Sequence, residues 1–110
     1  FVIAAMEGDR VAAITPWYGA PLGDDAPDMS GLTAAVRGHF AADDGFFAAD
    51  AVRVFETKLK DMGKNVSFVF HEGTGHAFGN EENGLGTYDA DAKAAAWSDS
   101  IAFLKSQLSA

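Results

Sequence analysis

Two loops of the sequence carry side chains that could do acid–base chemistry. Asp43 and Asp44 are adjacent in one of them, and His76 stands in the glycine-rich segment 73–78. A carboxylate that hydrogen-bonds an imidazole fixes the tautomer of the ring and stabilises its cation, as in hydrolytic triads. Neighbouring glycines let the backbone turn tightly and leave the ring accessible. The sequence therefore holds candidates for the acid and the base of a triad, without an obvious nucleophile.

Simpler interpretations stand beside these roles. His76 could be a loop histidine without a function, and Asp44 could be a turn residue that bonds its own backbone. We expect His39 to be a structural histidine inside a strand and His71 to end a strand. A metal site formed by Asp43, Asp44 and His76 is conceivable, but the spacing is not specific for any metal. We therefore expect no metal and no cofactor.

The elements that must position these side chains alternate between strand and helix. Apolar runs predict strands at 11–15, 35–40 and 65–70, although the stretch 32–40 as a whole is ambiguous. We expect helices at 1–6, with Gly8 just past the end, at 49–62 and at 89–108. The chain starts at Phe1 rather than at Met, inside an expected helix, so we expect it to be cut within an element. The pair Asp24-Asp25 is expected in a solvated loop.

Helical spacing of apolar residues predicts which face of each long helix is buried. In the helix at 49–62 the apolar residues are Val52, Phe55, Leu59 and Met62. In the helix at 89–108 they are Ala94, Trp97, Ile101, Leu104 and Leu108.

Strands that alternate with helices indicate an α/β fold with a mostly parallel sheet. In such folds the functional groups lie in loops at the carboxyl ends of the strands. The loop with Asp44 follows the second expected strand, and the loop with His76 follows the third. We therefore expect both side chains at the same edge of the sheet, within reach of each other.

Composition limits the classes of partner. The chain has 110 residues, enough for one small domain or a part of a larger one, and a net charge of −8. The negative charge and the scattered basic residues argue against nucleic acid, and the apolar runs are too short to span a membrane. The absence of cysteine excludes a Cys nucleophile within these residues and fits a cytoplasmic protein.

The segments around Asp44 and His76 both resemble segments of the dienelactone hydrolase family of α/β-hydrolases. Segment 38–47, Gly-His-Phe-Ala-Ala-Asp-Asp-Gly-Phe-Phe, is similar to the Gly-x-Phe-Gly-x-x-Asp-x-Phe-Val pattern around the family's catalytic Asp. Segment 73–78, Gly-Thr-Gly-His-Ala-Phe, is similar to the Gly-x-Gly-His-x-Phe pattern around its catalytic His. The Trp-Tyr-Gly at 17–19 and the last helix also resemble the family, so the resemblance covers nearly the whole chain.

The resemblance implies that residues 1–110 are the C-terminal half of an α/β-hydrolase, with about three parallel strands and flanking helices. Asp44 would be the acid, because it is in register with the family pattern and Asp43 is not, and His76 would be the base. The family's nucleophile, a Cys or a Ser on a Gly-x-Cys-x-Gly elbow, would lie just before Phe1. Since no serine of the chain has such a context, we expect the chain to be inactive alone.

The resemblance also implies an ester or lactone as substrate. Four aromatic residues could line an acyl pocket or be ordinary core residues, namely Trp17, Tyr18, Phe46 and Phe78. Of these, we expect Tyr18, Phe46 and Phe78 to bind the substrate. Family members that hold a substrate carboxylate commonly have Ser after the His and Arg soon after. Here those positions are Ala77 and Asn80, so such a clamp is not evident.

Half of a hydrolase sheet would leave a strand edge and an apolar face uncovered. We therefore expect the chain to form a homo-oligomer or to dock with a complementing N-terminal half. The alternative is a truncated, non-catalytic domain that acts through self-association or ligand binding.

Overall fold

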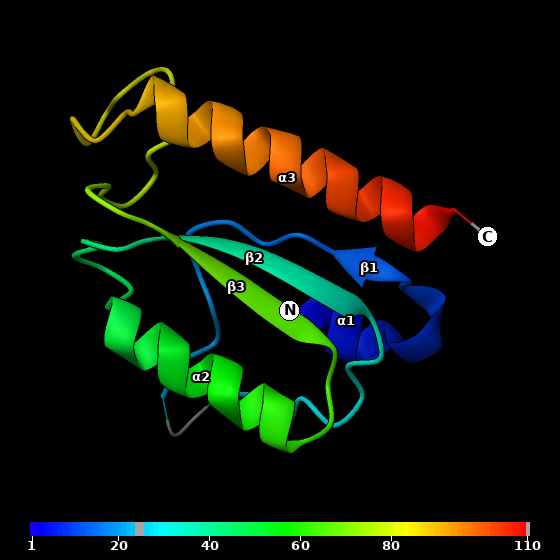
Figure 1. The fold of residues 1–110 in the computed structure, drawn as a ribbon. Coiled ribbons are helices and arrows are strands. Elements are labelled where there is room, and N and C mark those ends of the chain that lie inside the picture. Colours follow the sequence, from blue (N-terminus) through cyan, green and yellow to red (C-terminus); the bar gives the residue numbers. More distant parts are fainter. Residues whose placement is uncertain (24–25, 110) are drawn as a thin grey trace.

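The computed structural model describes residues 1–23 and 26–109 (Figure 1). The pair Asp24-Asp25, expected in a solvated loop, lies outside the described residues. Along the chain the elements are α1 (Val2–Glu7), a short 3-10 helix η1 (Gly8–Arg10), β1 (Ala13–Ile14), β2 (Ala35–Ala41), α2 (Ala49–Asp61), β3 (Val66–His71) and α3 (Ala90–Leu108).

The three strands form one parallel sheet in the order β1-β2-β3. The pairing of β2 with β3 is the longest, running from Val36 opposite Val66 to Ala41 opposite His71. The first strand is shorter than the predicted 11–15, because β1 pairs with β2 only at Ala13 and Ile14. The predicted α/β class with three parallel strands is thus confirmed.

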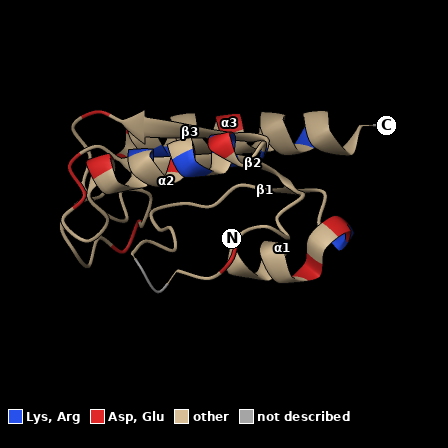
Figure 2. Ribbon diagram, turned by 90° about the horizontal axis from the view of Figure 1, so that it is seen from below, with Lys and Arg blue, Asp and Glu red and all other residues tan. Residues whose placement is uncertain are grey.

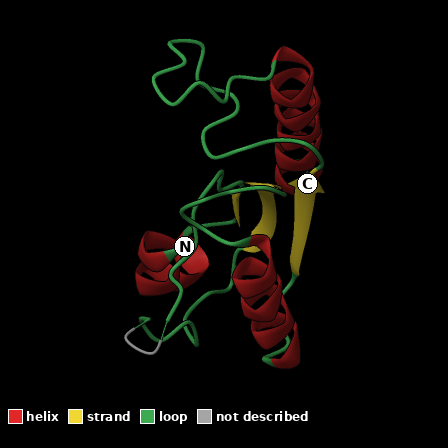
Figure 3. Ribbon diagram, turned by 90° about the vertical axis from the view of Figure 1, so that its left-hand side faces the viewer, coloured by secondary structure: helices red, strands yellow, loops and turns green. Residues whose placement is uncertain are grey.

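Helices cover both faces of the sheet. Figures 1 and 3 show α3 on one face, with α1 and α2 on the other. The main apolar core lies on the side of α2, where Val52 and Leu59 are fully buried against the β2 residue Phe40. The predicted buried face of α2 is therefore confirmed for its central residues, while Met62 at the end of the helix is exposed. Among the described residues, no helix is both long and apolar enough to cross a membrane.

Helix α3 turns a different face to the sheet from the one predicted. Its buried residues are Ala96 and Ser100, whereas Trp97 of the expected stripe is 60% exposed. The hydroxyl of Ser100 lies 2.9 Å from the hydroxyl of Thr15 and accepts a hydrogen bond of 3.1 Å from the indole N–H of Trp17. The prediction was wrong because a small residue with hydrogen-bond partners packs here in place of the large apolar ones.

Charges of both signs are mixed along α2, as Figure 2 shows. Arg53 pairs with Asp50 at 3.6 Å and Lys60 with Glu56 at 3.4 Å, each one turn apart. The Arg53–Asp50 pair is exposed and contributes little to stability, whereas the Glu56 carboxylate is mostly buried and also accepts the N–H of Phe68 at 2.7 Å.

A polar cluster links α3 to the sheet. Arg37 of β2 donates two hydrogen bonds to the carboxylate of Asp99 on α3, at 2.8 and 3.2 Å. His39, which is fully buried, lies 3.0 Å through Nδ1 from Nε2 of His71. Its own Nε2 is 3.0 Å from Asp99 but does not make a well-directed hydrogen bond. Burial lowers the pKa of His39 to about 4, although the Asp99 carboxylate opposes the shift.

This cluster makes stability depend on pH. An unfolded histidine has a pKa near 6.5, so below that pH the unfolded chain takes up a proton that folded His39 binds only near pH 4. The contribution of neutral His39 to the free energy of unfolding is therefore complete above about pH 6.5. It decreases as the pH falls towards 4. The shift corresponds to about 3 kcal/mol at most. Burial lowers the pKa of His71 as well, which acts in the same direction.

We predict that His39→Gln, which cannot titrate, weakens this dependence. Between about pH 7 and pH 4.5 the wild-type chain should lose about 2 kcal/mol more of its free energy of unfolding than the variant does. Urea unfolding at both pH values measures the difference. Equal losses in the two proteins would show that His39 does not drive the dependence.

Candidate active site

The parallel sheet brings the loop that holds Asp44 next to the loop that holds His76. Strands β2 and β3 end at paired residues, Ala41 opposite His71, so the loops that follow start side by side. The pairing continues into the loops, because Ala42 N–H donates to the carbonyl of His71 at 3.1 Å and Asp43 N–H to that of Thr74 at 2.9 Å. The site thus lies at the carboxyl edge of the sheet, where α/β folds hold their functional groups.

Asp44 and His76 form a hydrogen-bonded pair. Nδ1 of His76 lies 2.8 Å from Oδ2 of Asp44, whose side chain is 1% exposed. The other carboxylate oxygen accepts the N–H groups of Phe46 and Phe47, at 2.7 and 2.8 Å. Asp44 is therefore both a turn residue and the partner of the histidine, whereas Asp43 is exposed. Because a carboxylate only accepts hydrogen bonds, Nδ1 carries the proton of the neutral ring.

Among the residues that the structure describes, only Nδ1 of the His76 ring has a hydrogen-bond partner. Its side chain is 23% exposed, and Nδ1 is committed to Asp44, so Nε2 is left to exchange a proton with another molecule. The ring of Phe47 stacks on it at 5.7 Å, with 20° between the planes, and the ring of Phe46 lies at 4.9 Å. An imidazole held in this way is suited to act as a general base.

The backbone around His76 is fastened at consecutive residues. Thr87 Oγ1 donates to the carbonyl of His76, Asn80 N–H to that of Ala77 at 3.0 Å, and Asp89 N–H to that of Phe78 at 2.7 Å. Ala77 has φ of 61°, which is unusual for a residue with a Cβ atom. The glycine-rich pattern around His76 did not indicate a role for Thr87. The only signal for Thr87 in the sequence is its position at the end of the same loop.

The three predicted substrate-binding residues differ in exposure. Phe78 is fully buried in a second apolar cluster with Ala41 and Ala96. The ring of Tyr18 lies 5.7 Å from that of His76, and its hydroxyl accepts the N–H of Gly79. Phe46 is 69% exposed beside His76. Contact with a substrate stays a prediction, and the exposure favours Phe46 for it.

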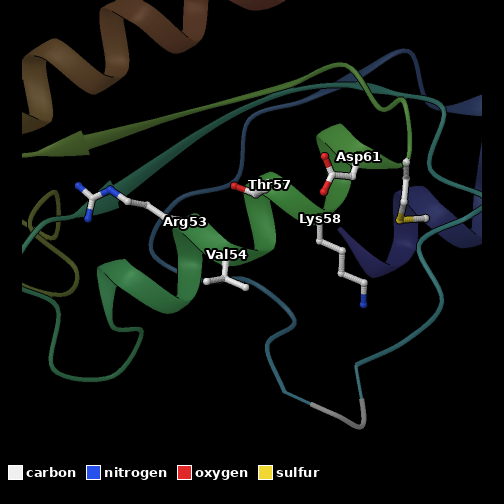
Figure 4. A pocket seen from close by; sticks show the side chains of 6 residues that line it. Arg53, Val54, Thr57, Lys58 and Asp61 are labelled. Carbon is white, nitrogen blue, oxygen red and sulfur yellow. The ribbon is translucent and has the colours of Figure 1, made fainter.

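The described residues hold no nucleophile bonded to the histidine. Within residues 1–23 and 26–109, the hydrogen bonds of His76 go to Asp44 and Thr87, not to a serine hydroxyl. In the same part of the chain, no three His, Asp or Glu side chains are placed to hold a metal ion. The pocket in Figure 4 lies on the outer side of α2, and the residues that line it include neither Asp44 nor His76.

The sequence matches the family model described as the dienelactone hydrolase family over residues 1–108. The chain belongs to this family. A search of curated proteins found no match. The family assignment carries with it the hydrolase-like fold, of which the three parallel strands and their helices are a part.

Solved structures share this fold. A dienelactone hydrolase-like promiscuous phosphotriesterase from metagenomic libraries matches 96% of this chain with a TM-score of 0.82 and 20% identity. A protein assigned as a dienelactone hydrolase from Klebsiella pneumoniae matches 92% with a TM-score of 0.73 and 18% identity. The chain spans less than half of these structures, 46% and 44% of their lengths.

The pairing of Asp44 with His76 predicts the tautomer of the ring. We expect Asp44→Asn to move the proton from Nδ1 to Nε2, because the new amide can donate to Nδ1 where the carboxylate could only accept. Nitrogen-15 shifts of the His76 ring measure the tautomer directly. Asp43→Asn is the matched control and should leave the ring unchanged. The same response in both variants would remove the case for Asp44 as the acid.

Proposed function

We propose that this chain is the C-terminal, acid–base half of a dienelactone hydrolase-like enzyme that cleaves a carboxylic ester or lactone. The observation that supports it best is the 2.8 Å hydrogen bond between the buried carboxylate of Asp44 and Nδ1 of His76. An acid–base pair of this geometry activates a nucleophile in hydrolytic triads.

In the proposed reaction the nucleophile is a Cys or Ser outside this chain, as the resemblance to the family implies. His76 takes its proton through Nε2 as the nucleophile attacks the carbonyl carbon, and the imidazolium then protonates the departing alkoxide oxygen. Water attacks the acyl intermediate in the second half, with His76 again as base. Asp44 remains ionised and stabilises the imidazolium. No cofactor or metal enters these steps.

The substrate belongs to the proposal only as a class. A small ester or lactone would place its acyl group beside the exposed ring of Phe46. Ala77 and Asn80 provide no positive charge for a substrate carboxylate, which favours an uncharged group at that position. A cytoplasmic location is part of the proposal and agrees with the absence of cysteine.

In this proposal an N-terminal half would cover a surface that residues 1–110 leave open. Among the described strands β1 pairs only with β2, so its other edge is unpaired. Trp97 and Ile101 on α3 are 60% and 37% exposed, although the Trp97 ring also packs edge-on against Trp17, and Ile3 on α1 is 75% exposed. Large exposed apolar side chains near a free strand edge favour an association. Since the matched structures are about twice as long as the chain, we propose their N-terminal half as the partner.

Activity should require both halves. We predict that the chain alone does not turn over p-nitrophenyl acetate, because in this proposal the nucleophile and the oxyanion donors lie outside these residues. The chain fused to the N-terminal half of a family member that carries a Gly-x-Cys-x-Gly elbow should hydrolyse it. His76→Ala in the fusion should lower kcat by about 10³-fold or more. Turnover by the chain alone that His76→Ala abolishes would reveal a nucleophile within these residues.

The association can be tested on the outer face of α3. We predict that Trp97→Lys weakens binding to the N-terminal half, or self-association of the chain, by about tenfold or more, since buried Trp often dominates an interface. Val54→Lys on α2, where Val54 is 70% exposed, is the matched control and should change little. Sedimentation velocity at micromolar concentration measures both. A wild-type chain that stays monomeric and ignores the N-terminal half would contradict the proposed surface.

The second candidate is a non-catalytic domain that acts through association or ligand binding, and the same exposed face of α3 favours it. The two candidates differ in the fusion experiment. A folded fusion without His76-dependent turnover, together with an association that Trp97→Lys weakens, favours the second.

A further inference from the structure

Tyr18 has a strained backbone close to the candidate active site. Its φ is 69°, and the N–H of Gly19 donates to the carbonyl of Trp17 at 2.9 Å, so Tyr18 is the central residue of a three-residue γ-turn. A γ-turn with positive φ is rare, and bulky residues seldom adopt it. Such a conformation persists only where surrounding contacts hold it.

The turn is fastened to the middle strand. The N–H of Tyr18 donates to the carbonyl of His39 at 2.9 Å, and the N–H of His39 donates to the carbonyl of Pro16 at the same distance. These bonds form the isolated parallel bridge between Trp17 and His39, beyond the end of β1. The backbone of Tyr18 is therefore attached to the strand that leads to Asp44.

The side chain of Tyr18 reaches the loop of His76. Its hydroxyl oxygen accepts the N–H of Gly79 at 3.0 Å, and its ring packs edge-on against Phe78 at 5.2 Å. The ring also lies 5.7 Å from that of His76. A Cβ atom at Gly79 would lie 2.5 Å from the Tyr18 hydroxyl, so only glycine fits this contact as it stands. Burial raises the pKa of Tyr18, which keeps the hydroxyl protonated at neutral pH.

The loop needs such a support on this side. Ala77 has φ of 61°, so the backbone between His76 and Gly79 is itself in an unfavourable conformation. Thr87 holds the loop at the carbonyl of His76, and Tyr18 holds it at the N–H of Gly79. The two hydrogen bonds lie on either side of the strained residue.

We propose that Tyr18 is a positioning residue. Its hydroxyl fixes the backbone of Gly79 and its ring supports the imidazole, so that Nδ1 of His76 stays within hydrogen-bonding distance of Asp44. In the γ-turn conformation the side chain reaches the loop of His76. The importance of this role rests on the proposed function of His76 as a base. It differs from the substrate contact that the sequence predicts for Tyr18.

Tyr18→Phe tests the role in the chain as it exists. The variant keeps the ring and removes the acceptor of the Gly79 N–H. We expect hydrogen exchange of the Gly79 amide to become about tenfold faster, as loss of one hydrogen bond would allow. The signal of the His76 Nδ1 proton should broaden or disappear, because its exchange with water becomes faster. Tyr88→Phe, which alters the exposed second tyrosine of the chain, is the matched control and should change neither signal.

Gly79→Ala tests the same contact from the side of the loop. The new Cβ atom would displace the hydroxyl of Tyr18. We expect the same change at the His76 Nδ1 proton. The free energy of unfolding of each variant separates this effect from a general loss of stability. An unchanged His76 signal in Tyr18→Phe, or an equal change in Tyr88→Phe, would overturn the proposal. These signals need no hydrolysis, so an inactive fusion would refute the proposed function and leave this test intact.

Discussion

The parallel pairing of β2 with β3 is the constraint on which the site depends. The strands are in register up to Ala41 opposite His71, and two further backbone hydrogen bonds continue the pairing into the loops. Asp44 and His76 follow these paired ends at short distances along the chain. A shift of register by one residue would turn the side chains of one strand to the opposite face and separate the loops. The chemistry of the chain is therefore a consequence of its longest strand pairing.

The two faces of the sheet differ in what holds them. Apolar side chains such as Phe40 and Leu59 fill the face beneath α2. The face beneath α3 combines a small apolar cluster of Ala41, Phe78 and Ala96 with hydrogen bonds from Trp17 to Ser100 and from Arg37 to Asp99. Several large apolar residues of α3, among them Trp97 and Ile101, remain exposed. We propose that the other half of a hydrolase domain covers these exposed residues.

The features that follow from local pattern could be predicted from the sequence. The apolar runs gave β2 and β3, and the parallel topology placed Asp44 and His76 at one edge. The buried face of α3 could not be predicted, because hydrogen bonds from distant residues decide the burial of Ser100. The conformation of Tyr18 could not be predicted either, since a bulky residue at positive φ contradicts its own preference. The His39–His71 contact depends on strand register, which composition does not reveal.

Asp44 and His76 are held in place by hydrogen bonds from within this chain. Amide hydrogen exchange of the isolated chain tests this most directly, at Phe46 and Phe47, which donate to Asp44, and at Asp89, which donates to Phe78 beside His76. We expect these amides to be protected to a similar degree as those of the β2–β3 pairing. Exchange as fast as in an unstructured peptide, with the sheet still protected, would contradict it.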